Sequence, residues 1–262
     1  MSFKVAASDF DGTLYRNEKM SDDDLTAIKN WRSAGNKFGI VTGRCYPMLK
    51  APLKNFDLQF DFAICCNGAI IFDGDGQIVS EHALPKNILV ELINEPCMSK
   101  SFHFLFEAAD ESFCVGVEKK SWVWREKSAW DFFLTFTDAA QIPNLPKPIN
   151  QLALGFDTPE EAQIATDALN QKFGEQIFAQ RNTYSVDIVP AGFNKAQGVK
   201  NLLQVMNWHG AKVFVIGDES NDLPMIKNFG GYTVVTAKDF VKREASKVFA
   251  SVGDMLNNFV DY

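Results

Sequence analysis

The stretch FKVAASDFDGT, residues 3–13, sets the fold of this chain. Residues 3–8 form an apolar run that predicts a buried β-strand, and Asp9 follows this run directly. The motif Asp-Phe-Asp-Gly-Thr of residues 9–13 then places two carboxylates and a glycine just beyond the strand. Because ligands in open parallel sheets bind beyond the carboxyl ends of the strands, this motif indicates a ligand site at such an end.

Three further motifs extend the same pattern. Thr42-Gly43-Arg44 follows a predicted strand at residues 37–41, and Gly-Asp-Glu-Ser-Asn-Asp at residues 217–222 follows a predicted strand at residues 212–216. Lys195 begins a predicted helix. If the strands are parallel neighbours, their carboxyl ends meet at one edge of the sheet. We therefore expect the motifs to converge on a single crevice.

The residues in these motifs suit a phosphate and a divalent cation. The motifs supply four carboxylates, Asp9, Asp11, Asp218 and Asp222. Carboxylates gathered without a cation repel one another, and Mg²⁺ is a hard cation that prefers oxygen ligands of this kind. Lys195, Thr42 and the backbone N–H groups at Asp11 and Gly12 could hold phosphate oxygens, with Gly12 allowing close approach of the backbone.

The two carboxylates of Asp9 and Asp11 can take two different roles in phosphoryl transfer. One carboxylate can attack phosphorus and form an aspartyl-phosphate. Its neighbour two residues along can protonate the leaving oxygen and then activate water, which contributes roughly 10²–10⁴-fold to rate in known enzymes. The pair therefore predicts phosphoryl transfer through a covalent intermediate.

The chain outside these motifs divides into a core and an insertion. Alternating strands and helices predict a parallel α/β sheet built from residues 1–83 and 188–262. The intervening residues 84–187 read as a separate α+β module, with alternating phenylalanines at 102–106 and a capping box at residues 158–161. Trp122 and Trp124 alternate in this module and predict its core, with a substrate-facing surface or a partner surface as alternatives.

Composition narrows the class of protein. The net charge of −7 over 262 residues argues against nucleic-acid binding, and no apolar run approaches the ~20 residues that span a bilayer. The five cysteines contain no CxxC pair and include two adjacent residues, a pattern typical of reduced thiols. With no secretory signal visible, we expect a cytoplasmic protein without a membrane partner. The sequence does not indicate an oligomeric state.

The four motifs together resemble those of the haloacid dehalogenase-like phosphatase superfamily, and more narrowly the Cof-type hydrolases with a type C2 (IIB) cap. The resemblance implies a Rossmann-like parallel sheet core with an inserted α+β cap that governs substrate specificity. It implies that Asp9 is the nucleophile and Asp11 the general acid and base. It implies a phosphate-binding set of Gly12, Thr42, Gly43, Lys195 and Asn221. It implies Mg²⁺ ligation by Asp9, Asp11 through its carbonyl, and Asp218, with support from Asp222.

The resemblance also suggests a substrate class. Arg44, Asn67 and Gly68 match segments that lie near the substrate, although a turn or a surface position explains them equally well. We expect a small phosphorylated metabolite as the partner, with sugar phosphates first and nucleotides, pyridoxal phosphate or flavin mononucleotide as alternatives. Two other functions use the same residues: a sugar phosphomutase or phosphotransferase, and a non-catalytic sugar-phosphate-binding regulator.

Overall fold

The computed structural model describes residues 3–260 and contains two compact units. The first unit comprises residues 1–43, 52–80 and 194–262, and the second comprises residues 44–51 and 81–193. The chain therefore leaves the first unit and returns to it, as the sequence predicts for a core with an insertion. The expected role of the second unit in specificity stays a prediction.

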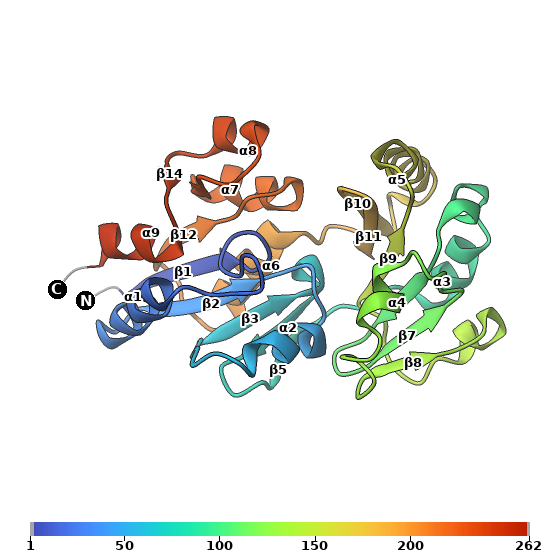
Figure 1. The fold of residues 1–262 in the computed structure, drawn as a ribbon, viewed down its shortest axis with the longest axis horizontal. Helices are drawn as coiled ribbons and strands as arrows, with labels where there is room; N and C mark the ends of the chain where they lie inside the picture. Colours follow the sequence, from blue (N-terminus) through green and yellow to red (C-terminus); the bar gives the residue numbers. More distant parts are fainter. Residues whose placement is uncertain (1–2, 261–262) are drawn as a thin grey trace. The chain divides into compact units, whose positions relative to one another are not determined.

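The first unit is built on a six-stranded sheet in the order β12-β1-β2-β3-β4-β5 (Figure 1). The four strands from β12 to β3 run parallel, and β4 runs antiparallel to β3. The strands are β1 (Lys4–Asp9), β2 (Lys37–Val41), β3 (Phe62–Cys65), β4 (Ile70–Asp73), β5 (Ile78–Glu81) and β12 (Lys212–Ile216), with a small separate pair β13 (Thr233–Val234) and β14 (Val248–Phe249).

Helices cover both faces of the parallel part of this sheet. On one face Val199 and Leu202 of α6 pack with Val5 and Val215. On the other face Trp31 of α1 makes an edge contact with Phe214. The helices of this unit are α1 (Asp22–Ser33), α6 (Lys195–Val205), α7 (Leu223–Phe229), α8 (Asp239–Glu244) and α9 (Val252–Phe259), and α2 (Tyr46–Leu53) crosses the boundary between the units. This is the α/β architecture predicted from the alternating pattern.

The second unit contains a six-stranded sheet in the order β10-β11-β9-β6-β7-β8. All neighbouring strands pair antiparallel except β7 and β8. The strands are β6 (Phe104–Glu107), β7 (Ser112–Val115), β8 (Leu134–Phe136), β9 (Gln151–Gly155), β10 (Ile177–Asn182) and β11 (Ser185–Pro190), and the helices are α3 (Lys86–Ile93), α4 (Trp122–Glu126) and α5 (Pro159–Phe173).

One face of the second sheet is apolar and carries the helices. Phe106, Leu152 and Ile188 lie in register on neighbouring strands and share a hydrophobic core with residues of α3 and α5. The predicted cap of α5 is present, because the side chain of Thr158 accepts the N–H of Glu161. The opposite face of the sheet carries buried polar side chains, which we call the polar face: Glu107, Ser112, Gln151, Gln180 and Asp187.

The second compact unit runs to Phe193, past the bound expected at residue 187, because β11 continues to Pro190 and pairs with β10 along that length. Trp122 and Trp124 lie in the short helix α4. The ring of Trp122 makes edge contacts with Trp130 and His103, so it belongs to an aromatic cluster of the unit.

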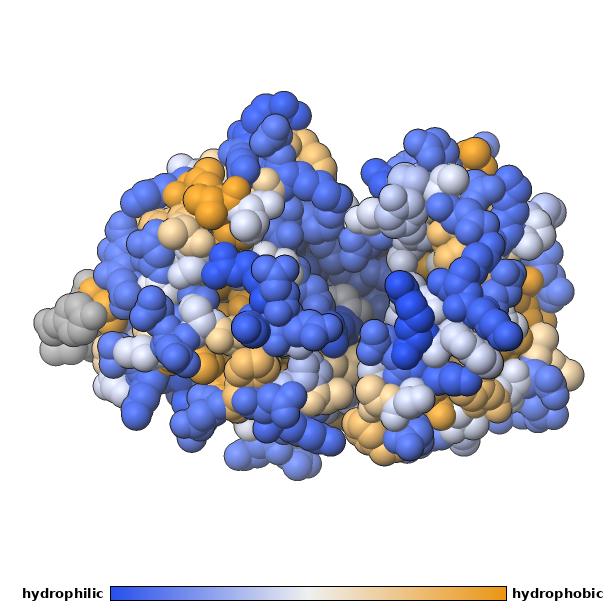
Figure 2. All heavy atoms as spheres, viewed as in Figure 1, coloured by the Kyte–Doolittle hydropathy of each residue, from blue (hydrophilic) through white to orange (hydrophobic). Residues whose placement is uncertain are grey.

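The face shown in Figure 2 is mainly hydrophilic, and its hydrophobic side chains stand in small separate groups. Within residues 3–260, no helix is both long enough and apolar enough to cross a bilayer. The cytoplasmic location stays a prediction.

Candidate active site

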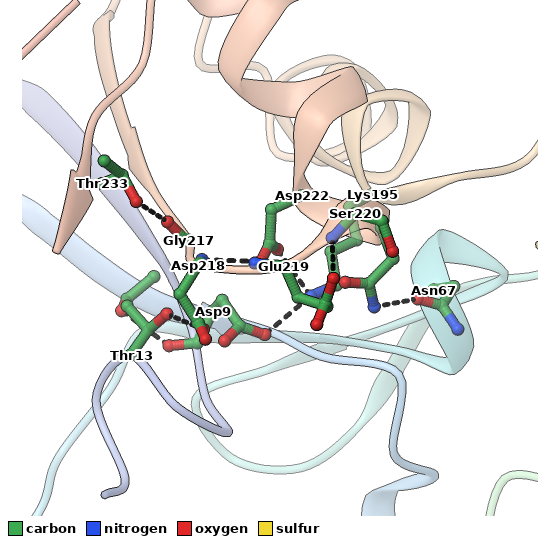
Figure 3. A network of polar contacts seen from close by, with 12 residues as sticks. Asp9, Thr13, Asn67, Lys195, Gly217, Asp218, Glu219, Ser220, Asp222 and Thr233 are labelled. Atoms are coloured by element: carbon green, nitrogen blue, oxygen red, sulfur yellow. Dashed lines mark hydrogen bonds and ion pairs between the residues drawn. The ribbon is translucent and has the colours of Figure 1, made fainter. Parts of the chain in front are cut away.

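Three neighbouring strands of the first unit bring the motifs together. Asp9 is the last residue of β1, Thr42 follows β2, and Asp218 lies two residues after β12. Because β12, β1 and β2 are parallel neighbours, these residues share one end of the sheet. Figure 3 shows Asp9, Lys195, Asp218 and Asp222 gathered there. We call these four residues the Asp9 cluster.

Lys195 lies at the centre of the Asp9 cluster. It is the first residue of α6, whose N-cap Asn194 accepts the N–H of Gln197. Its side chain is only 1% exposed, and Nζ lies 2.6 Å from Oδ1 of Asp9 and 2.7 Å from Oδ1 of Asp222. Burial lowers the pKa of Lys195, but Asp222 and Asp9 outweigh that effect and raise the pKa above its ordinary value. Lys195 is therefore a charged, immobilised ammonium group.

Asp222 organises the loop that follows β12. Its Oδ2 accepts the N–H groups of Asp218 at 2.9 Å and Glu219 at 3.0 Å, and it forms a capping box with Glu219. Gly217 is required in this turn, because a Cβ there would lie 2.3 Å from Cγ of Asp222. Asp222 therefore fixes both the loop and Lys195.

Asp218 is held from the side of β1. The hydroxyl of Thr13 donates to Oδ1 of Asp218 at 2.6 Å. Gly12 has φ +84°, and a Cβ on it would lie 2.4 Å from Oδ2 of Asp218. The N–H of Gly12 donates to the carbonyl of Tyr15 at 2.9 Å, and its expected contact with phosphate stays a prediction. Gly12 serves here by letting Asp218 approach the backbone.

The Asp9 cluster fits a divalent cation. Asp9, Asp218 and Asp222 each offer an oxygen within 4.8 Å of the others. Oδ2 of Asp9 is buried and has no hydrogen-bond partner among the described residues, as a cation ligand would be before the ion is bound. Burial and Asp222 raise the pKa of Asp9 well above its usual value, while Lys195 opposes them. Both oxygens of Asp222 are already engaged, so Asp9 and Asp218 are the better direct ligands.

A second set of contacts joins Thr42 to the Asp222 loop. The N–H of Asn67 donates to the carbonyl of Thr42 at 3.0 Å, and the side chain of Asn221 donates to Oδ1 of Asn67 at 3.1 Å. Asn67 has φ 50° and is fully buried. A Cβ on Gly68 would lie 2.3 Å from the carbonyl oxygen of Asn194, so this glycine allows α6 to begin close to the loop. Asn67 thus connects Thr42 with Asn221, and Gly68 allows close packing against α6; the sequence did not indicate these structural roles.

The remaining predicted residues are placed differently. Asp11 lies just beyond β1 and is exposed, and its expected role as acid and base stays a prediction. Gly43 follows Thr42 directly and is partly buried. Arg44 folds with the second unit, where its guanidinium donates to the carbonyl of Met48 at 3.0 Å. A substrate contact by Arg44 stays a prediction.

Sequence reasoning assigned no role to three residues that shape the site. Thr13 orients Asp218, Glu219 completes the capping box with Asp222, and the hydroxyl of Thr233 donates to the carbonyl of Gly217 at 2.7 Å. Thr13 and Glu219 lie inside the motifs, so the sequence could have indicated that they help to shape the site. Thr233 offers no such signal, because its contact depends on the fold of a distant segment.

Comparison with known proteins identifies the family. The model of the haloacid dehalogenase-like hydrolases matches residues 6–254, and the chain belongs to this family. Pyridoxal phosphate phosphatase YbhA of Escherichia coli is 26% identical, covering 97% of this chain and 94% of that protein. The 5-amino-6-(5-phospho-D-ribitylamino)uracil phosphatase YcsE of Bacillus subtilis is 24% identical, covering 95% and 90%. The structure of the subclass IIB sugar phosphatase BT4131 has a TM-score of 0.77 at 19% identity, covering 98% of both chains.

These comparisons confirm three expectations. The Cof-type haloacid dehalogenase resemblance and the fold class are both correct. The predicted enzyme class, a phosphoric monoester hydrolase of this family, is also confirmed. The roles of individual residues, the metal and the covalent intermediate stay predictions.

Proposed function

We propose that this chain is a Mg²⁺-dependent phosphatase that hydrolyses small phosphomonoesters through an aspartyl-phosphate on Asp9. Sugar phosphates are the first substrate class. The observation that carries the proposal is Asp9 itself, whose Oδ1 is held by Lys195 while its buried Oδ2 lacks a partner among the described residues. A protein that only binds phosphate has no need of this arrangement.

In the first step a carboxylate oxygen of Asp9 attacks phosphorus, and the bond from phosphorus to the ester oxygen breaks. Asp11 donates a proton to that oxygen, which leaves as an alcohol. Lys195 keeps Asp9 in place and neutralises charge on the transferring phosphoryl group. Thr42 and Asn221 would contact the remaining phosphoryl oxygens.

In the second step Asp11 accepts a proton from water as the water oxygen attacks phosphorus. The bond between phosphorus and Asp9 breaks, and inorganic phosphate and a free carboxylate result. Mg²⁺ held by Asp9, the carbonyl of Asp11 and Asp218 would supply positive charge that stabilises the phosphoryl oxygens in both steps. Asp222 would keep Lys195 and the Asp218 loop in position throughout.

The relatives favour hydrolysis over transfer to a second sugar. Two relatives matched along most of their length are a pyridoxal phosphate phosphatase and a 5-amino-6-(5-phospho-D-ribitylamino)uracil phosphatase. We therefore place pyridoxal phosphate, one of the expected alternatives, and related phosphates of nitrogen heterocycles beside sugar phosphates in the proposed substrate class.

Phosphate release tests the proposal. Purified protein is assayed with p-nitrophenyl phosphate, hexose phosphates and pyridoxal 5′-phosphate, with Mg²⁺ and with EDTA. We expect release with Mg²⁺ and at least about a 10²-fold loss after chelation, because the cation stabilises transition-state charge. Undiminished release in EDTA would contradict the metal assignment, and no release from any compound would contradict the phosphatase.

A further inference from the structure

Asp11 differs in exposure from the residues around it. Within residues 9–16 it is the one exposed residue, because its neighbours are buried or partly buried. An exposed side chain on a turn takes its direction from the backbone beneath it, since surface connections are the more mobile parts of a fold. The proposed mechanism needs Asp11 beside the leaving oxygen at the moment when Asp9 attacks phosphorus. The contacts that fix this turn therefore bear on catalysis.

The backbone of Tyr15 fixes the turn on both sides of Asp11. Its N–H donates to the carbonyl of Phe10 at 2.7 Å, and its carbonyl accepts the N–H of Gly12 at 2.9 Å. Phe10 and Gly12 are the residues immediately before and after Asp11. Asp11 and Tyr15 also form an isolated β-bridge. A shift of the Tyr15 backbone would therefore move Asp11 directly.

The ring of Tyr15 holds that backbone against the core. It stacks on the ring of Phe10, with the centroids 4.9 Å apart and the planes 4° from parallel. Phe10 is fully buried. An edge contact joins Tyr15 to Phe56, with the centroids 6.0 Å apart and the planes at 82°. Aromatic pairs in these geometries stabilise a fold beyond the area that they bury, so the rings favour one conformation of the turn.

The residue after Tyr15 is anchored separately. One guanidinium nitrogen of Arg16 lies 3.4 Å from Oδ2 of Asp24, and the other donates to the carbonyl of Ala250 at 3.2 Å. Asp24 is fully buried, so the chain beyond the turn is attached to the body of the first unit. These two contacts involve neither Asp11 nor the residues beside it. The direct link to Asp11 thus runs through Tyr15.

We propose that Tyr15 is a positioning residue, whose stacked ring aims the Asp11 carboxyl group at the leaving-group oxygen. This inference rests on the proposed phosphatase function. As the bond from Asp9 to phosphorus forms and the ester bond breaks, the proton of Asp11 passes to the ester oxygen. Loss of the ring lets the turn relax, and a displacement of about 1 Å can lower a rate by about 10²-fold. The loss should grow with the basicity of the leaving oxygen, because a more basic oxygen depends more on the acid.

Three substrates with the same ring but different leaving groups test this role. p-Nitrophenyl, phenyl and benzyl phosphate release oxygens of increasing basicity. p-Nitrophenolate leaves with little help from an acid, whereas the benzyl alkoxide needs a proton. The parameter kcat/KM includes every step up to phosphoryl transfer to Asp9, so it reports departure of the leaving group. In Tyr15→Leu we expect kcat/KM to fall at least about tenfold more for benzyl phosphate than for p-nitrophenyl phosphate.

Three further variants separate positioning from stability. Tyr15→Phe keeps the stacked ring and should keep the native ratio of kcat/KM values. Phe56→Leu removes the edge contact and should change the ratio in the same direction as Tyr15→Leu, which also covers the case that Tyr15→Leu does not fold. Trp208→Leu removes a ring that likewise has two aromatic contacts, but at the opposite end of α6 from the Asp9 cluster. It should lower stability and leave the ratio unchanged.

A double variant tests whether Tyr15 acts through Asp11. Asp11→Asn removes the acid and should make kcat/KM fall steeply from p-nitrophenyl to benzyl phosphate. Adding Tyr15→Leu to Asp11→Asn should change that ratio by less than about twofold, because the effects of residues that act as one unit are not additive. Full additivity of the two changes would overturn the inference, since Tyr15 would then act without Asp11.

The outcomes separate this inference from the proposed function. An equal fall for all three substrates in Tyr15→Leu, or the native ratio in that variant, would overturn the inference and leave the phosphatase in place. The same ratio in Tyr15→Leu and Trp208→Leu would do so too. A native chain that releases no phosphate from p-nitrophenyl phosphate would remove the proposed function itself.

Discussion

The Asp9 cluster and the polar face both contain buried carboxyl groups, but the cost of burying these groups is offset in different ways. In the Asp9 cluster an ammonium stands between two carboxylates, because Lys195 bonds Asp9 and Asp222. In the polar face Glu107 bonds an amide, a thiol and a backbone N–H, and its raised pKa favours the neutral acid. Paired charge suits catalysis on a charged phosphoryl group, whereas the polar face avoids a buried negative charge by favouring the protonated form of Glu107.

The largest expected effect comes from removing the ammonium of the Asp9 cluster. Lys195→Met should lower kcat/KM about 10²–10³-fold, because one group that stabilises transition-state charge is lost. It should also lower the free energy of unfolding by about 3–5 kcal/mol, since Asp9 and Asp222 then stay buried without their partner. Steady-state kinetics and urea unfolding measure the two quantities.

A matched control lies on the same helix. Lys200 is exposed and bonds the side chain of Asn228, so Lys200→Met should change both quantities little. If Lys195→Met changes kcat/KM and the free energy of unfolding as little as Lys200→Met does, the Asp9 cluster does not depend on paired charge. Its contrast with the polar face is then lost.

The next effect tests the polar face through pH. The pKa of Glu107 is raised from 4.5 to about 8, so the folded state holds a proton that the unfolded state has lost between these values. Stability should therefore fall as pH rises from about 4.5 through 8, by up to about 5 kcal/mol from this group. Glu107→Gln should flatten that decline in unfolding free energy measured at several pH values.

Glu118→Gln is the control for this prediction. Glu118 is 60% exposed beside Lys120, so its removal should leave the pH dependence unchanged. Parallel pH profiles for the native chain and Glu107→Gln would mean that the fold does not favour the protonated form of Glu107, and the contrast with the Asp9 cluster would disappear.

The smallest effect concerns the backbone of the Asp9 cluster. Gly12→Ala places a methyl group 2.4 Å from Oδ2 of Asp218 at φ +84°. We expect a loss of about 1–3 kcal/mol in unfolding free energy and a weaker response of activity to Mg²⁺, because Asp218 must shift. Gly35→Ala is the control, since Gly35 has φ +82° but open space around it. If the activity of both variants responds equally to Mg²⁺, the close contact between Gly12 and Asp218 does not influence the binding of the cation.

The sequence predicts the Asp9 cluster well for a physical reason. The strands before Asp9, Thr42 and Asp218 are continuous apolar runs, and parallel pairing sends their ends to one edge. Lys195 as the first residue of α6 also follows from local pattern. The contacts of Thr13 and Asn67 were not predictable, because each joins segments that lie far apart in the chain.

The polar face could not be predicted from the sequence. Glu107 ends the run Phe-Leu-Phe-Glu, and an acid at the end of a strand normally indicates the point where the chain reaches solvent. Its burial depends on strand order, since β9 lies between β6 and β11 although β9 is far from both in sequence. Short helices such as α2 and α4 were missed because their length gives too little periodicity to detect.

The measurement that tests the central claim most directly is the rate of phosphate release by Asp9→Asn beside the native chain at saturating Mg²⁺. The substitution keeps the shape of the side chain but removes the nucleophilic carboxylate. We expect phosphate release to fall by at least about 10⁴-fold while the circular dichroism spectrum stays native, because the variant lacks the nucleophile of the proposed covalent intermediate. Turnover of Asp9→Asn at the native rate would contradict the account, because phosphorus would then be attacked by some group other than Asp9.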